Sequence, residues 1–133
     1  MPPTPEQLAR SGTEAAHQTA LFCWAALNQE TYPELKLMFH IPNGGTRDRV
    51  EAGHLKAQGV KSGVPDICLP FAVYPYHALW IELKVGKNKL SDNQDAFCEQ
   101  LKYRNYAIVV CYSWFEAMNV IISYLKGTYQ NAD

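Results

Sequence analysis

Hydrophobic residues recur along this chain with two spacings, one typical of helices and one typical of strands. Residues 13–27 have the three-to-four-residue spacing of a helix that buries one face. The apolar stripe consists of Ala16, Ala20, Cys23, Trp24 and Leu27. Ser11 or Thr13 is suited to cap its first turn. The pattern predicts a helix that packs against a core.

The rest of the chain alternates between strand-like and helix-like segments. Strands are predicted at 35–41, 66–73, 78–85 and 106–112, and helices at 48–58, 91–101 and 113–125. This order favours an α/β fold, a mixed central sheet flanked by helices. We expect one domain over residues 13–126, between a proline-rich flexible lead-in at 1–12 and a tail at 127–133.

Composition narrows the class of protein. The chain has 133 residues, 47% of them hydrophobic, and no apolar run of about eighteen residues, so no membrane span is expected. The first residues lack the basic start and apolar stretch of a signal peptide. Four cysteines lie far apart without zinc spacing, which predicts reduced thiols and a cytoplasmic location.

The charge is unevenly distributed. The net charge is −1, which argues against generic nucleic-acid binding, yet ten of the twelve Lys and Arg residues fall between Lys36 and Arg104. Seven acids share that span. A local basic face is therefore compatible with a nearly neutral chain.

The predicted hairpin around residues 66–85 carries the strongest candidate chemistry. Asp66 opens the first strand, and Glu82 and Lys84 point to the same face of the second, opposite Ile81. Buried carboxylates persist only when they are paired or bound to a cation. We therefore expect Asp66 and Glu82 to hold a hard divalent metal, with the Leu83 carbonyl as a third oxygen ligand.

Two further polar residues have both a structural and a functional interpretation. Glu14 is either a first-turn acid that interacts with the helix dipole or a site carboxylate that binds metal through water. Gln94 completes a capping box with Ser91, yet its helix directly follows the strand of Glu82, so it could also face the site. Glu116 is expected to complete a second capping box with Ser113.

Several positions are candidates for contact with phosphates. Asn43 and Gly44 lie in a turn that would expose backbone N–H groups, although an ordinary turn explains them equally well. The basic or polar candidates are Arg47, Arg49, Lys61, Ser62, Lys87 and Lys89. A solvated loop is the alternative interpretation of Lys61, Lys87 and Lys89.

Pro65-Asp66, sixteen residues, then Glu82-Leu-Lys84 resembles the PD-(D/E)xK nuclease signature. The surrounding segments make the likeness more specific: Phe39-His-Ile-Pro-Asn-Gly-Gly, Lys56 to Asp66, Trp80-Ile-Glu-Leu-Lys and Leu90-Ser-Asp-Asn-Gln. Together they resemble the VRR-NUC family over roughly residues 13–126, in its stand-alone form from phages and bacteria. One departure is Val60-Lys-Ser-Gly, where the family name refers to a Val-Arg-Arg-like element.

The resemblance implies a restriction-endonuclease-like core and Mg²⁺- or Mn²⁺-dependent cleavage of DNA. It implies a homodimer that acts on branched DNA such as a Holliday junction, within a bacterial cell or a phage-infected host. The family's metal-binding acids match Asp66 and Glu82, its motif lysine matches Lys84, and its other site residues match Glu14 and Gln94.

Two other classes of function stay open. One is a DNA-binding module on the same fold that does not cleave. The other is a protein-interaction domain in which Asp66 and Lys84 form only a buried ion pair, which predicts no salt-dependent affinity for DNA.

Overall fold

The protein is seen here as a computed structural model that describes residues 1–42 and 48–132. Within that part of the chain, four strands form a mixed sheet in the order β1-β2-β3-β4. They are β1 (Phe39–His40), β2 (Ile67–Leu69), β3 (Leu79–Leu83) and β4 (Ala107–Cys111). Strands β1, β2 and β3 run antiparallel, and β3 pairs in parallel with β4. The predicted mixed α/β architecture is confirmed.

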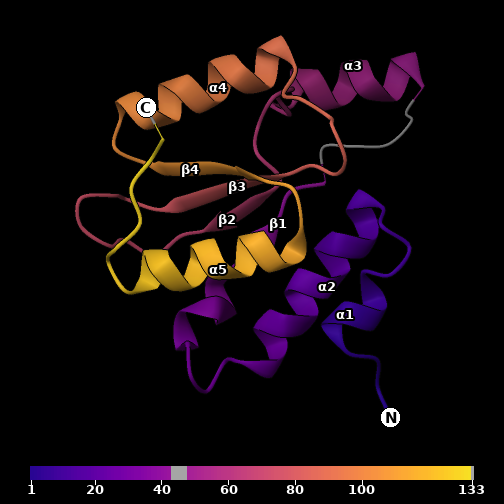
Figure 1. Ribbon diagram of the computed structural model, residues 1–133. Coiled ribbons are helices and arrows are strands. Elements are labelled where there is room, and N and C mark those ends of the chain that lie inside the picture. Colours follow the sequence, from indigo (N-terminus) through magenta and orange to yellow (C-terminus); the bar gives the residue numbers. More distant parts are fainter. Residues whose placement is uncertain (43–47, 133) are drawn as a thin grey trace.

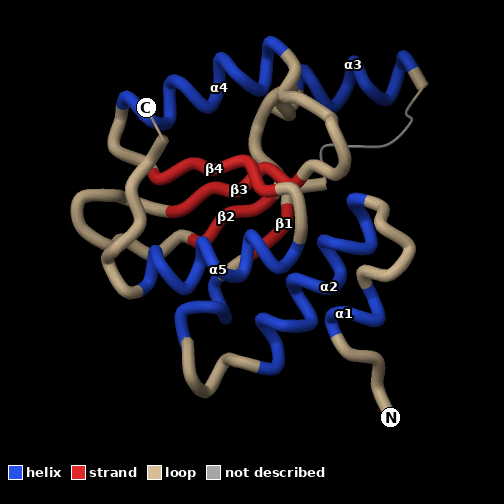
Figure 2. Tube along the Cα trace, in the orientation of Figure 1, coloured by secondary structure: helices blue, strands red, loops and turns tan. Residues whose placement is uncertain are grey.

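Helices lie on both sides of the sheet (Figures 1 and 2). Helix α2 (Glu14–Leu27) and helix α5 (Trp114–Leu125) pack together below the strands, and α4 (Asp92–Tyr103) packs on β4 from the other side. Helix α3 (Arg49–Ala57) is seen past one end of α4 in Figure 1. In the described residues, no helix combines the length and hydropathy needed to cross a bilayer.

The core lies between the sheet and the α2–α5 layer. It contains Leu21, Leu69, Ile81, Leu83 and Ile121, each at most 1% exposed. Burial of one such side chain stabilises the fold by roughly 1.5–3 kcal/mol. Because side chains alternate along β3, burying Ile81 and Leu83 in this layer directs Glu82 to the opposite face, as predicted.

Helix starts follow their predicted caps. The Thr13 and Ser91 side chains accept hydrogen bonds from the backbone N–H groups of Ala16 and Gln94. Asp48 caps α3 in the same way. Glu116 differs from the prediction: its carboxylate accepts from the Tyr112 N–H, one residue before the cap Ser113, so the second capping box does not form.

Other local predictions were wrong. The strand predicted at 35–41 contains only Phe39–His40, because Pro33 starts a 3₁₀ helix, η1 (Pro33–Leu37), that buries Leu35. The strand predicted at 66–73 ends at Leu69, since Pro70 lacks the N–H needed to continue the ladder. Strands β3 and β4 are each shorter at their ends than predicted.

The predicted lead-in and tail both make specific contacts in the described residues. The lead-in contains helix α1 (Pro5–Leu8), closed by a capping box between Thr4 and Gln7 and packed against α2. The tail is held by Asn131, whose side chain bonds to the Tyr106 carbonyl and the Ile108 N–H. These contacts occupy the otherwise free edge of β4. The division at residues 13 and 126 itself stays a prediction.

Candidate active site

Asp66 is fixed where the chain enters β2. Its Oδ2 accepts a hydrogen bond of 3.0 Å from the Leu83 N–H on the neighbouring strand. Its carbonyl accepts from the Ile41 N–H at 2.7 Å and lies 3.0 Å from His40 Nδ1. These contacts come from two adjacent strands, so the sheet itself orients the carboxylate.

Glu82 is the one charged residue buried among the described residues, at 3% exposure. Its Oε2 accepts a 3.2 Å hydrogen bond from Gln94 Nε2 and lies 4.0 Å from Lys84 Nζ. Burial, followed by the charge of Asp66 and a hydrogen bond between the two carboxyl groups, raises the pKa of Glu82 to about 8. The Lys84 ammonium opposes that rise.

The second oxygen of Glu82 has no donor. Oε1 is buried, and no described group donates a hydrogen bond to it when the carboxylate is ionised. Two adjacent carboxyl groups in this setting either share a proton or hold a cation. Hard oxygen donors suit Mg²⁺ or Mn²⁺, so Asp66 and Glu82 fit a divalent metal.

The side chains that fit the metal are limited to the carboxylates of Asp66 and Glu82. Among the described residues, no three His, Cys, Asp or Glu side chains gather closely enough to ligate one ion. The Leu83 contact that the structure shows is its N–H on Asp66. Direct ligation by Glu14 is thus unsupported, and the Leu83 carbonyl stays a prediction.

Gln94 performs both of the roles considered for it. Its Oε1 accepts from the Ser91 N–H at 2.9 Å, and its own N–H donates to Ser91 Oγ at 3.2 Å, which completes the capping box. Its Nε2 is therefore directed at Glu82 from a side chain whose other end is fixed. The first turn of α4 positions a buried carboxylate of β3.

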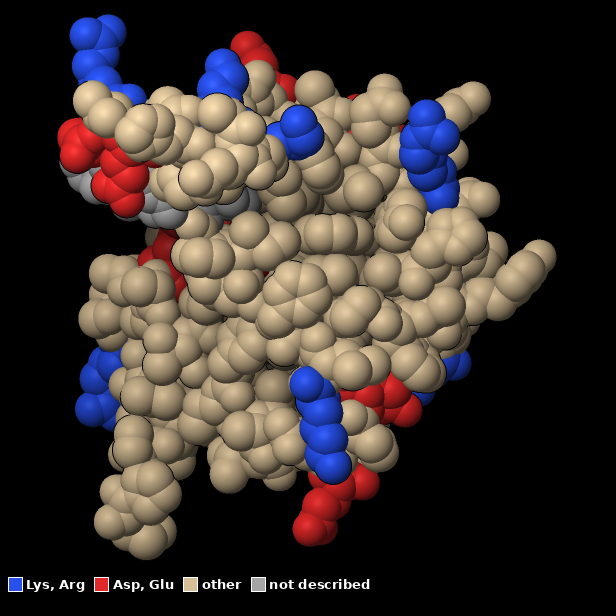
Figure 3. All heavy atoms as spheres, turned by 180° about the vertical axis from the view of Figure 1, so that it is seen from behind, with Lys and Arg blue, Asp and Glu red and all other residues tan. Residues whose placement is uncertain are grey.

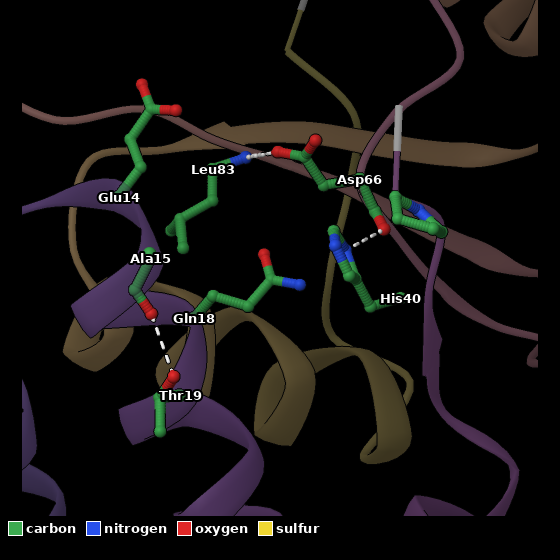
Figure 4. A pocket seen from close by; sticks show the side chains of 8 residues that line it. Glu14, Ala15, Gln18, Thr19, His40, Asp66 and Leu83 are labelled. Atoms are coloured by element: carbon green, nitrogen blue, oxygen red, sulfur yellow. Dashed lines mark hydrogen bonds between the residues drawn. The ribbon is translucent and has the colours of Figure 1, made fainter. Parts of the chain in front are cut away.

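Glu14 lies exposed in the first turn of α2, and it lines a cavity together with Asp66 and Glu82. The cavity, of about 360 Å³, is also lined by Ser62, Lys84 and Gln94. In Figure 4 the Glu14 carboxylate extends away from the helix at the same level as Asp66. Acidic atoms lie recessed in a hollow at the left of Figure 3. The structure thus brings Glu14, Asp66, Glu82, Lys84 and Gln94 around one opening.

The loop before Asp66 is anchored to α4. Asn93 Nδ2 donates a 3.0 Å hydrogen bond to Ser62 Oγ. Gly63 has φ +90°, and a Cβ there would lie 2.5 Å from the Asn93 carbonyl oxygen. Only glycine tolerates both this backbone conformation and this approach. Ser62 therefore lines the cavity, and its contact with a phosphate stays a prediction.

The candidate phosphate contacts have a mixed outcome. Arg49, Lys61, Lys87 and Lys89 are exposed, on α3 and on the loops beside the cavity. On the face shown in Figure 3 the basic side chains stand apart from one another. Asn43, Gly44 and Arg47 lie outside the described residues.

Sequence reasoning missed a second cavity, on the α2 side of Asp66 (Figure 4). Its volume is about 440 Å³, and its lining includes Gln18 and His40 as well as Glu14 and Asp66. The only sequence signal was the placement of Gln18 one turn after Glu14, on the same helix face. Nothing in the sequence connected either residue with His40.

Comparison with known proteins gives a family. The model of the VRR-NUC domain family matches residues 5–114. A solved structure described as a "VRR_NUC domain protein" is 28% identical to this chain and superposes with a TM-score of 0.74. The matched region covers 90% of this chain and 98% of that one. A search of curated proteins found no match. With a nuclease-type domain over most of its length and paired carboxylates at the two central strands of its sheet, this chain belongs to the VRR-NUC family.

Proposed function

We propose that this protein is a metal-dependent DNA endonuclease that hydrolyses phosphodiester bonds and uses Mg²⁺ or Mn²⁺. The observation that carries the proposal is the buried Glu82 carboxylate, which lies beside Asp66 with one oxygen lacking a donor. The family supports nuclease chemistry in general. The metal requirement follows from the donor set: two adjacent carboxyl groups in a cavity that opens to solvent.

Asp66 and Glu82 would hold the ion, which when bound supplies a Lewis acid and lowers the pKa of a coordinated water. The Leu83 N–H keeps one Asp66 oxygen in place, which leaves the other directed at the ion. Gln94 fixes Glu82 in the same way through Oε2. The pair is thus oriented before substrate arrives, which lowers the cost of forming the reactive complex.

Lys84 is the chain's own cation at the site. Its side chain is 15% exposed, and its ammonium lies 4.0 Å from Glu82 Oε2, a distance that leaves its donors free to turn toward a phosphate oxygen. An ammonium that is largely removed from water stabilises developing negative charge more strongly than a fully solvated one. We assign Lys84 the role of contacting the scissile phosphate.

DNA would reach the site along the exposed basic residues. Arg49 lies on α3, Lys61 on the loop before Asp66, and Lys87 and Lys89 on the connection from β3 to α4, and all four are exposed. Such contacts position the backbone without reading sequence. We further propose that the substrate is branched DNA and that a homodimer cuts two strands, since a two-fold assembly presents two equivalent sites to antiparallel strands.

The decisive experiment compares linear duplex, flap and four-way-junction DNA, each with Mg²⁺, Mn²⁺ or EDTA. We expect cleavage with either metal, none in EDTA, and the fastest cutting on a branched substrate. Asp66→Asn and Glu82→Gln should reduce cleavage to the EDTA level, whereas Glu99→Gln, at a carboxylate 62% exposed on α4, should not.

Three results would redirect the assignment. Metal-dependent cutting by both site variants would contradict the roles of Asp66 and Glu82. Salt-dependent DNA binding without cleavage under any condition would favour a non-cleaving DNA-binding module. Absence of salt-dependent DNA affinity would favour a protein-interaction domain. The ion pair expected between Asp66 and Lys84 would then be one between Glu82 and Lys84, which lie 4.0 Å apart.

A further inference from the structure

The cavity on the α2 side of Asp66 contains a donor that no described residue pairs with. Gln18 Nε2 is buried and has no hydrogen-bond partner in residues 1–42 and 48–132. In Figure 4 the amide projects from α2 into the cavity toward His40. An unpaired buried N–H is destabilising, so a side chain that keeps one suggests a partner that arrives from solution.

His40 offers a hydrogen-bond acceptor to complement the Gln18 donor. Its Nδ1 lies 3.0 Å from the Asp66 carbonyl, which can only accept, so Nδ1 carries the proton. In the neutral imidazole the other nitrogen is then an acceptor. Thus a donor from Gln18 and an acceptor from His40 line the same cavity. Asp66, whose carboxylate would bind the metal, lines it too.

The charge of the walls selects against a phosphate. Among the described lining residues, Glu14 and Asp66 are acidic and none is Lys or Arg. A second phosphate would meet repulsion here, whereas Lys84 serves the neighbouring cavity. A neutral group with hydrogen-bonding edges is favoured instead.

Size and shape favour a nucleobase. The volume of about 440 Å³ falls in the range of pockets that bind small organic groups. Glutamine amides pair with base edges, and imidazole rings stack on bases. Ala15 and Leu83 supply apolar wall beside these polar groups.

We propose that this cavity binds the unpaired nucleobase next to the scissile phosphate, through Gln18 and His40. The inference rests on the proposed nuclease function and specifies its substrate. A base that is paired and stacked in a duplex must first be extruded, and extrusion is least costly at a nucleotide that is already unpaired. The cavity therefore gives branched DNA an advantage over linear duplex.

The test begins by mapping the cut made by the wild-type protein on the branched DNA that it cleaves fastest. An abasic analogue is then placed on either side of the cut. At one of these positions it should lower kcat/KM about three- to tenfold, the value of one or two hydrogen bonds. Gln18→Ala should cause a similar loss on intact DNA and little further loss on the abasic substrate.

Gln100→Ala, at an exposed glutamine of α4, is the matched control and should behave as wild type on both substrates. Gln18→Leu keeps the volume and removes the unpaired donor. It should raise the melting temperature of the DNA-free protein by about 2–6 °C while losing the base-dependent rate. A glutamine that served only the fold would lower that temperature.

A binding assay separates this inference from the nuclease proposal. Junction DNA with 2-aminopurine at successive positions around the branch is titrated with protein in EDTA. One position should gain fluorescence with the wild type and Gln100→Ala, and lose that gain with Gln18→Ala. No gain at any position, or an equal gain with Gln18→Ala, would overturn the base-binding cavity and leave the endonuclease proposal intact. Failure to cleave any substrate overturns the endonuclease proposal instead.

Discussion

Replacing Glu82 by glutamine tests the electrostatics of the site without any substrate. In the metal-free protein the Glu82 carboxyl is buried beside Asp66, which raises its pKa from 4.5 to about 8. Glutamine has nearly the same shape but no charge to desolvate. Glu82→Gln should therefore stabilise the metal-free protein at pH values where the unfolded chain has an ionised carboxylate.

The magnitude follows from proton linkage. Between pH 4.5 and about 8 the folded protein keeps the Glu82 proton that the unfolded chain has released. Folding stability then falls as pH rises, by roughly 1 kcal/mol per pH unit. Across that window the wild type should lose on the order of 4 kcal/mol relative to Glu82→Gln. Below pH 4.5 this difference should no longer change.

Urea unfolding in EDTA, followed by tryptophan fluorescence from pH 5 to pH 8.5, measures the effect. Glu99→Gln is the control, because that carboxylate is 62% exposed and its stability difference from wild type should stay nearly constant with pH. Adding Mg²⁺ or Mn²⁺ at pH 8.5 should restore stability to the wild type and not to Glu82→Gln, since only the former retains both carboxylates.

A difference between wild type and Glu82→Gln that does not change from pH 5 to pH 8.5 would refute the reasoning. It would mean that the buried carboxylate is compensated at every pH, as in a stable ion pair with Lys84. If added metal raised the stability of both proteins, the assignment of Glu82 as a ligand would be refuted.

Other predictions concern the frame of the site. Gly63→Ala should lower both stability and cleavage. Gly59 has φ +101° and nothing within 4 Å of an added Cβ, so Gly59→Ala should lower the free energy of unfolding only by the roughly 1–2 kcal/mol of backbone strain. Urea unfolding and cleavage assays compare the two variants. Asn131→Ala should reduce the free energy of unfolding by about 2 kcal/mol, because the β4 edge loses its partners; unchanged unfolding would contradict this. The half-exposed Cys23 should react first with a thiol reagent. The three buried thiols are Cys68, Cys98 and Cys111, and burial raises their pKa values to about 11 or 12. They should react only on unfolding.

Local signals predicted most of the helices and the orientation of β3. A cap such as Thr13 or Ser91 acts within one turn, so its neighbours in sequence are its neighbours in space. Alternation along β3 placed Glu82 and Lys84 on one face for the same reason. The family resemblance, carried by short segments around these residues, was confirmed by comparison.

Contacts between distant segments needed the tertiary structure. The sequence could not show that Asp66 accepts the Leu83 N–H, because strand pairing depends on register and not on periodicity. It offered the capping box and the site as alternatives for Gln94, and the structure shows that one amide serves both. The 3₁₀ helix at 33–37 formed where a strand was predicted, since burying Leu35 outweighed local propensity.

What the sequence by itself determined was a set of candidate site residues, through the motif and the family resemblance, and the face of β3 on which Glu82 lies, which follows from local periodicity. What only the tertiary structure decided was which groups meet: Asp66 with Glu82 beneath α4, and Gln18 with His40 across the second cavity. Burial and electrostatic coupling depend on those meetings, because the low-dielectric surroundings that perturb a carboxylate are assembled from segments far apart in the chain.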